Sequence, residues 1–192
     1  MRELEMQGEQ NETKCKHCSY LRPDTAFNNC SCPDAPPSPA PELKKLDYFV
    51  GNWTTEATVV SGPWGKGGKF SDSDSGMWMK GGFYLLNHSD FSLPPNLGGS
   101  GTSLAIMGYD ADRKVYTEER FDSLGRHVVM TGTLNGDTLT WTGENNYNGM
   151  QIESRFTFKM ISSSSYTVKY EVSADGGTTW LPFWHDGKAT KK

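Results

Sequence analysis

The fold is decided by the stretch Ile152-Glu153-Ser154-Arg155-Phe156-Thr157-Phe158-Lys159-Met160, followed shortly by Tyr166-Thr167-Val168-Lys169-Tyr170-Glu171-Val172. In both segments, apolar or small side chains alternate with polar ones. Successive side chains of a β-strand point to opposite faces of a sheet, so this alternation predicts two strands, each with one buried and one solvated face. The same period of two begins near residue 52 and continues to the end of the chain.

Ten strands are predicted, over residues 53–60, 69–79, 82–91, 102–109, 113–121, 126–134, 137–145, 151–160, 165–173 and 179–189. Turn-forming residues separate them, as in Asn135-Gly136-Asp137 and Asp175-Gly176-Gly177. These connections are too short for parallel crossovers, so the strands run up and down in sequence order. Closure would remove the exposed sheet edges. We therefore expect an all-β, antiparallel up-and-down barrel of eight to ten strands, preceded by a short helical turn that carries Leu43, Leu46 and Phe49.

The first 41 residues have a different composition from the rest. Five prolines lie within residues 33–41, which is typical of an extended linker and marks a boundary. We therefore divide the chain into a largely irregular polar extension with its linker, residues 1–41, and a barrel, residues 42–192.

All four cysteines lie in the extension, at Cys15, Cys18, Cys30 and Cys32. Four thiolates could hold a zinc ion in a tetrahedral site, and the Cys15–Cys18 spacing is usual for one. The Cys30–Cys32 spacing is less usual. Redox-sensitive thiols and disulfides therefore remain alternatives to zinc.

Charge and hydropathy exclude several partners. The net charge is −4 at pH 7 and no long basic run occurs, which argues against nucleic acid or an anionic membrane as a partner. No run of 18 apolar residues is present, and the N-terminus is acidic without the apolar core of a secretory signal. We expect a cytoplasmic protein that is a monomer or a homodimer.

Four short motifs occur in an order that resembles a known bacterial family. They are Phe49-Val50-Gly51-Asn52-Trp53, Gly81-Gly82-Phe83-Tyr84-Leu85, Met107-Gly108-Tyr109-Asp110 and Phe121-Asp122-Ser123. The family is domain of unknown function 1579 (DUF1579), which belongs among the lipocalin-like, or calycin, barrels. The resemblance covers about residues 46–190.

The resemblance implies how the barrel is closed. Gly-x-Trp on the first strand is similar to the general lipocalin signature, in which the tryptophan plugs the closed end beneath a basic side chain of the last strand. Trp53 would be that plug, with Lys188 or Lys191 above it. Apart from the resemblance, the glycine-rich stretch at residues 62–69 is interpreted as a flexible loop over the barrel mouth, with Trp64 as a lid. Where the family often has tryptophan, this chain has Arg120.

Two strand faces are the candidates for the pocket lining. One carries Tyr116, Glu118 and Arg120; the other carries Tyr84, Leu86 and His88. The position of the family's tryptophan implies that the first face points inward, where Glu118 and Arg120 would form a buried pair; pointing outward, they would be an ordinary surface pair. Further apolar wall is expected from Met107 and Trp141. In contrast, Asp72 and Asp74 are interpreted as a solvated strand face.

Three functions are compatible with such a barrel. The first is binding of a small, largely apolar molecule in the interior. The second is a small enzyme of the cyclase or isomerase type, with Glu118 or His88 as acid or base and Arg120 holding an anionic group. The third follows from a resemblance to nitrobindin-type barrels, which bind haem through a histidine near the C-terminal end; His185 would be that ligand. No complete catalytic motif occurs in the sequence, so we favour the first.

Overall fold

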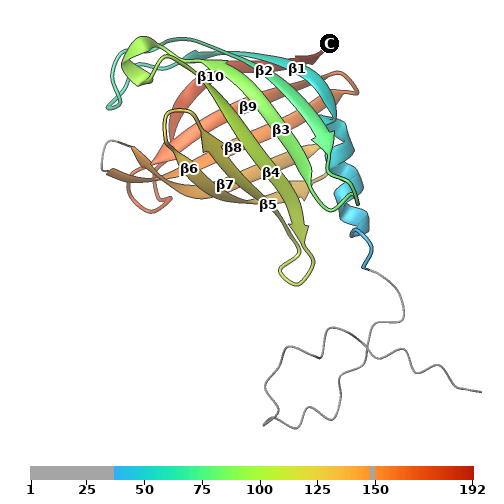
Figure 1. The fold of residues 1–192 in the computed structure, drawn as a ribbon. Helices are drawn as coiled ribbons and strands as arrows, with labels where there is room; N and C mark the ends of the chain where they lie inside the picture. Colours follow the sequence, from blue (N-terminus) through green and yellow to red (C-terminus); the bar gives the residue numbers. More distant parts are fainter. Residues whose placement is uncertain (1–36, 148–149) are drawn as a thin grey trace, which may run out of the picture. The chain divides into compact units, whose positions relative to one another are not determined.

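The computed structural model describes residues 37–147 and 150–192, which form a closed barrel of ten antiparallel strands (Figure 1). Each strand pairs with its neighbours in sequence, and pairing of β1 with β10 closes the barrel. The strands are β1 (Gly51–Val59), β2 (Gly68–Trp78), β3 (Leu85–Ser92), β4 (Ser100–Asp110), β5 (Val115–Asp122), β6 (His127–Asn135), β7 (Thr138–Tyr147), β8 (Met150–Ser162), β9 (Ser165–Ser173) and β10 (Leu181–Lys191). The predicted up-and-down barrel is confirmed, and each of the ten predicted strands lies within three residues of an observed one.

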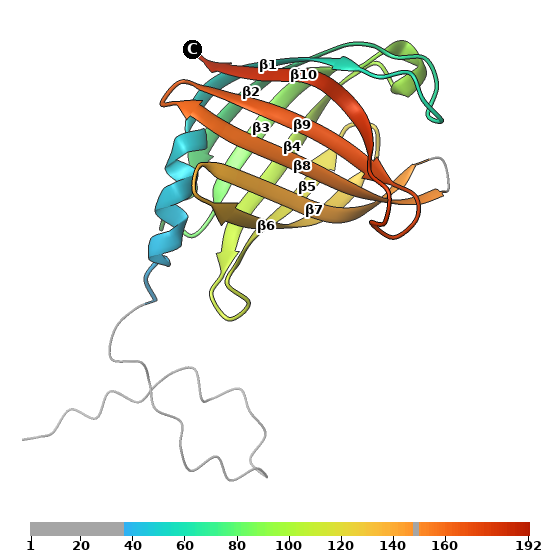
Figure 2. The same ribbon diagram turned by 180° about the vertical axis from the view of Figure 1, so that it is seen from behind.

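A 3-10 helix, η2 (Pro41–Phe49), lies at one end of the barrel, where Figures 1 and 2 show it in blue. Its buried residues are Leu43, Leu46 and Phe49. They recur every third residue, which matches the three residues per turn of a 3-10 helix, so all three project from the same side. The expected helical turn is therefore present, in the tighter of the two common helical forms.

Tryptophan Trp53 closes the barrel at the end that carries η2. Its side chain is almost fully buried and packs against Tyr48 and Tyr166, with ring centroids 5.3 and 5.0 Å away. The ammonium group of Lys191 lies 5.4 Å from the Trp53 ring centroid, within the range of a cation–π interaction. Lys191 therefore has the place expected for a basic side chain above the plug, whereas Lys188 is exposed.

The opposite end carries the longer loops and forms the mouth. A short 3-10 helix, η3 (Pro95–Leu97), lies in the β3–β4 loop there. A second, smaller apolar cluster lies below these loops; it contains Ala57, Val59, Phe70, Phe91 and Leu97. The larger cluster, around Trp53, fills the closed end. Apolar packing is thus concentrated at the two ends, and the space between them is available for a cavity.

Two predictions concern residues that the structure does not describe. Residues 1–36 of the extension, with Cys15, Cys18, Cys30 and Cys32, lie outside the described residues, so the zinc site and the division of the chain at residue 41 stay predictions. Among the residues that are described, no helix has the length and apolar character needed to cross a membrane.

Candidate functional site

The barrel encloses two adjoining chambers. The mouth chamber has a volume of about 220 Å³ and the deep chamber, nearer to η2, about 70 Å³. They adjoin because six residues line both, namely Phe70, Asp72, Arg120, Met130, Phe156 and Trp184. Since these six belong to β2, β5, β6, β8 and β10, the junction between the chambers is defined by strands from all around the barrel.

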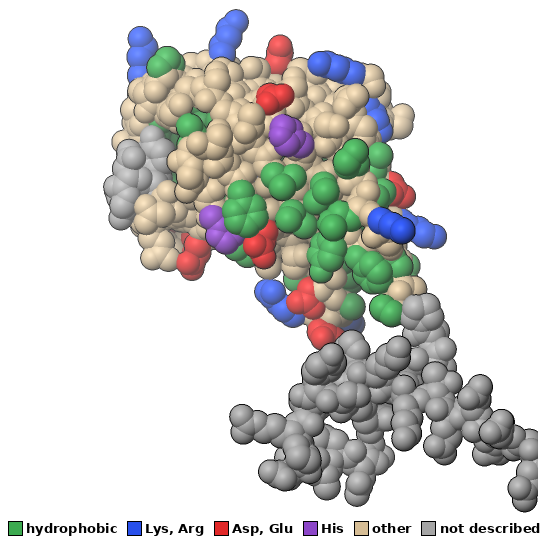
Figure 3. Space-filling model, in the orientation of Figure 1, with side chains coloured by type: hydrophobic (Ala, Val, Ile, Leu, Met, Phe, Trp, Pro, Cys, Tyr) green, Lys and Arg blue, Asp and Glu red, His purple; other side chains and the backbone are tan. Residues whose placement is uncertain are grey.

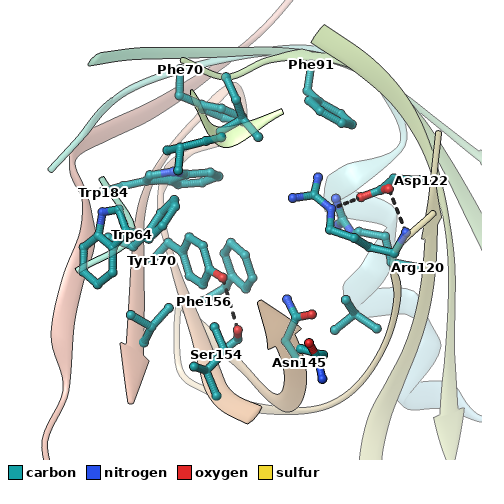
Figure 4. A pocket seen from close by; sticks show the side chains of 18 of the residues that line it. Trp64, Phe70, Phe91, Arg120, Asp122, Asn145, Ser154, Phe156, Tyr170 and Trp184 are labelled. Carbon is teal, nitrogen blue, oxygen red and sulfur yellow. Dashed lines mark hydrogen bonds and ion pairs between the residues drawn. The ribbon is translucent and has the colours of Figure 1, made fainter. Parts of the chain in front are cut away.

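One wall of the mouth chamber is made of aromatic rings. Figure 4 shows Phe70, Phe156, Tyr170 and Trp184 together on one side of the space, with Arg120 and Asp122 on the other. The rings of Phe156 and Tyr170 stack with centroids 4.0 Å apart, and those of Phe70 and Trp184 stack at 4.1 Å. Such packing holds the rings in fixed orientations, so the wall is preformed.

Tryptophan Trp64 of the β1–β2 loop lies at the mouth. Its ring packs against Phe183 with centroids 5.0 Å apart, and its Nε1 donates a hydrogen bond to the carbonyl oxygen of Val60 at 2.7 Å. Trp64 also lines the mouth chamber. The expected position of the residue 62–69 loop at the mouth, with Trp64 at its edge, agrees with this geometry.

Two ion pairs lie on the polar side of the cavity. Arg120 Nε donates to Glu118 Oε1 at 2.9 Å, and the Glu118 side chain is only 4% exposed. Arg126 Nε donates to Asp122 Oδ2 at 2.5 Å. Each arginine in the cavity wall therefore already has a carboxylate partner.

Two further carboxylates, Asp72 and Asp74, face Arg120 from β2. Burial alone would lower the pKa of Arg120, but the charges of Glu118, Asp74 and Asp72 outweigh this and raise its pKa, so the guanidinium stays protonated. Asp74 Oδ1 accepts a hydrogen bond from Asn87 Nδ2 at 3.2 Å. Burial raises the pKa of Asp74 as well. Arg120 is thus enclosed by three carboxyl groups.

Asp72 is the least satisfied of these groups. Its Oδ1 atom is buried and has no hydrogen-bond partner among the described residues. Burial, and then the charge of Asp74, raise the pKa of Asp72 to about 7. The charged groups that line the two chambers are Asp72, Asp74, Glu118, Asp122, Arg120 and Arg126. The four acidic side chains outnumber the two arginines, so hydrogen-bond acceptors are in excess in the cavity, and each of these two arginines already has a carboxylate partner.

The structure brings most of the predicted pocket residues together. Glu118, Arg120, Met107 and Trp141 line one or both chambers. Tyr116 also points inward, but it lies below the chambers, where its hydroxyl donates to the carbonyl oxygen of Glu42 at 3.0 Å. The inward orientation of the Tyr116–Arg120 face is therefore the one that the structure has.

The second predicted face is wrong. In β3 the inward residues are Leu85, Asn87 and Ser89, so His88 lies exposed on the outer face and cannot act as an acid or base in the cavity. Tyr84 is also outside, 49% exposed, against Gly108. The sequence is ambiguous here because Leu85 and Leu86 are adjacent at the start of the strand, and Leu85, not Leu86, is the one that points inward.

His185 is likewise on the outer face of the barrel. It is exposed, while its neighbour Trp184 points into the cavity and stacks on Phe70. A haem group bound in the cavity would therefore not be reached by His185.

Sequence reasoning missed Asp72 and Asp74. Both were assigned to a solvated face, yet they point inward with Phe70, two and four residues before them. The available signal was their even spacing from Phe70, because residues two and four positions apart in a strand share one face of the sheet. This signal was masked because all four residues from Ser71 to Asp74 are polar, which is equally typical of an exposed strand.

Comparison with known proteins places the chain in a family. A family model described as "Protein of unknown function (DUF1579)" matches residues 38–184. The chain belongs to the DUF1579 family. No curated protein matches this DUF1579 sequence. Among solved structures, the protein is similar to Rv2717c from M. tuberculosis, with a TM-score of 0.56 and 10% identity over 81% of this chain and 99% of that chain. At this identity the similarity shows the fold alone.

The raised pKa of Asp72 in this DUF1579 protein predicts a pH-dependent effect of Asp72→Asn. Well below pH 4 the carboxyl group is protonated in both the folded and unfolded states. Between about pH 4 and pH 7 the unfolded chain releases this proton while the folded protein still holds it, so stability is lost progressively until the pH passes the folded pKa of about 7, above which the folded protein carries a buried charge. Asparagine remains neutral, so we expect Asp72→Asn to be more stable than wild type by about 1–4 kcal/mol at pH 8.

Urea denaturation at pH 4.5 and pH 8 measures this effect. The advantage of Asp72→Asn should be much smaller at pH 4.5. Asp112→Asn, at an exposed position in the β4–β5 loop, is the matched control and should show no comparable pH dependence. An equal difference between Asp72→Asn and wild type at both pH values would refute the assignment.

Proposed function

We propose that this DUF1579 protein binds a small molecule in its barrel, with a flat apolar body against the aromatic wall and a neutral or cationic hydrogen-bond donor toward Asp72. The proposal is supported by the two sides of the cavity, aromatic on one and polar on the other (Figure 4). An apolar pocket with a few placed polar groups is the usual form of a small-molecule site.

The size of the cavity limits the body of the ligand. An apolar protein cavity of about 150 Å³ accommodates benzene. The mouth chamber is about 220 Å³, which is enough for one ring with a short side arm. A ring against Trp184 and Phe156 would leave the arm pointing to the junction of the chambers, where Asp72 and Arg120 lie.

The observation that carries the proposal is the unpartnered Oδ1 of Asp72. A buried acceptor without a partner is unfavourable by about 1–3 kcal/mol, and a ligand that supplies a donor removes this penalty. Trp184 Nε1 is a buried donor that also has no partner among the described residues. A hydroxyl group, which both donates and accepts, suits these two atoms, and a protonated amine suits Asp72.

An anionic ligand is disfavoured by the same geometry. Arg120 was expected to hold an anionic group, but three carboxyl groups already surround it. Arg126 is paired with Asp122. Adding a negative charge to a wall that already has four acids and two bases would increase repulsion in a medium of low dielectric constant. An enzyme that uses His88 as its acid or base is not supported either, because His88 lies on the outer face of the barrel, and the alternative, Glu118, is paired with Arg120.

The role of the aromatic wall can be tested with Trp184→Ala. We expect this change to weaken binding of 2-phenylethylamine by about 10-fold or more, since the ring loses a stacking partner and its buried area. A fluorescence or calorimetric titration measures the change, with circular dichroism to show that the barrel is folded. Trp180→Ala is the control, because Trp180 stacks on Arg155 outside the chambers. Equal affinities for the two variants would contradict the proposed wall.

A further inference from the structure

A broad apolar area lies on the outside of the barrel, over β3 and its neighbours. Figure 3 shows it as the green area on the face that the view presents. The large apolar residues that are 37–60% exposed on this side are Met77, Met79, Phe83, Tyr84, Leu104, Phe121 and Val129, and we call them the outer patch. The cavity does not involve them, since all point away from it or lie in the turn beside it.

Strand register shows that the outer patch is continuous. One row across the sheet runs Met77, Leu86, Ile106, Glu119 and Val129. The next row contains His88, Leu104, Phe121 and His127. Apolar side chains thus occupy neighbouring positions on five adjacent strands.

The size of the outer patch is that of half a dimer interface. Seven large residues, each about half exposed, present on the order of 600 Å² of surface. The largest apolar patch of a typical monomer is about 300–600 Å². A standard interface buries about 800 Å² on each partner, of which roughly 60% is apolar, so the outer patch supplies the apolar area that one subunit of a stable dimer needs.

The charged groups of the patch are complementary under two-fold symmetry. Glu119 lies on β5 and His88 on β3, so the two flank β4 on opposite sides. Glu119 is in register with Ile106 of β4 and His88 with Leu104, two residues along the same strand. A two-fold axis that crosses β4 obliquely between these two residues would place Glu119 of one protomer opposite His88 of the other, and the reverse contact would form at the same time. Within one protomer, His127 stacks on Phe121 at 4.5 Å and lies 3.4 Å from Glu119, which holds this carboxylate at the centre of the surface.

We propose that the outer patch is the interface of a homodimer, in which two barrels pack through β3, β4 and β5. The cavity mouth lies at the end of the barrel, away from the middle of these strands, so both cavities of the dimer stay accessible. The dimer and ligand binding are therefore independent properties.

Sedimentation velocity or light scattering of the full chain tests the proposal. The wild-type protein should have twice the 21.3 kDa mass of one chain at micromolar concentration. Val129→Glu should raise the dissociation constant at least about 10-fold, because it buries a charge in the interface. Ile161→Glu is the matched control, at an exposed residue of β8 outside the patch, and should remain dimeric.

A charge exchange separates the proposed geometry from a general loss of apolar surface. Glu119→Lys should weaken the dimer, and His88→Glu combined with Glu119→Lys should restore it, because the exchanged charges again face each other. A wild-type chain that stays monomeric up to hundreds of micromolar would overturn the proposal. So would a Val129→Glu variant as dimeric as Ile161→Glu, or a double variant no better than Glu119→Lys.

Discussion

Replacing Arg120 with alanine is expected to lower the free energy of unfolding by about 3–5 kcal/mol at neutral pH. The change leaves Glu118, which is 3% exposed, without its hydrogen-bond donor, and it removes the guanidinium that faces Asp72 and Asp74. Carboxylates left unpaired in the interior must either stay charged at high energy or take up protons. The loss of stability should therefore be smaller at acid pH.

Urea denaturation at pH 7 and pH 4.5 measures the loss. Arg113→Ala is the matched control, because Arg113 forms a pair with Asp110 at 3.9 Å on the surface, where its own side chain is 63% exposed. That change should alter stability by no more than about 0.5 kcal/mol. Adding Glu118→Gln to Arg120→Ala should recover part of the stability. A loss below about 1 kcal/mol for Arg120→Ala would show that the carboxylates do not depend on this arginine.

Replacing Trp53 with alanine is expected to have an effect of similar size, a loss of about 3–5 kcal/mol. Trp53 is 2% exposed, and its ring contacts Tyr48, Tyr166 and Lys191 at the closed end. Alanine would leave a cavity beneath η2 that the β-strands cannot close, because their pairing fixes the backbone positions. The cost therefore includes both the lost burial and the empty space.

Thermal and urea denaturation compare Trp53→Ala with Trp180→Ala. Trp180 is partly exposed in the loop between β9 and β10, so its loss should cost roughly 1 kcal/mol or less. Trp53→Phe should lie between wild type and Trp53→Ala, because a ring still fills part of the space. Equal stabilities of the Trp53→Ala and Trp180→Ala variants would contradict the role of Trp53 as the plug.

The strands could be predicted from the sequence because alternation and turn residues are local signals. Phe156 and Phe158 on β8, or Tyr166 and Val168 on β9, define an inward face without reference to any other strand. The plug at Trp53 followed from a family signature. The helical form of η2 was harder to predict, since a spacing of three residues is compatible with both an α-helix and a 3-10 helix.

The polar half of the cavity could not be predicted in the same way. Asp72 and Asp74 are inward because Arg120 and Asn87 on other strands compensate for their burial, and such compensation is not visible within β2. On β3, Leu85 and Leu86 are both apolar, so alternation does not distinguish the two faces there. The outer patch adds to this ambiguity, because its apolar residues make the outside of β3 and β4 similar to a core face.

The most direct test of the proposed function is a comparison of three ligands with the same ring and arm but different head groups: 2-phenylethylamine, 2-phenylethanol and phenylacetate. Their dissociation constants would be measured by calorimetry or NMR titration of the full chain at pH 7, with Trp184→Ala to confirm that binding occurs in the cavity. Because the arginines are already paired and the Oδ1 atom of Asp72 lacks a donor, the amine and the alcohol should bind at least about 10-fold more tightly than phenylacetate. Tighter binding of phenylacetate, or no binding of any of the three, would contradict the account.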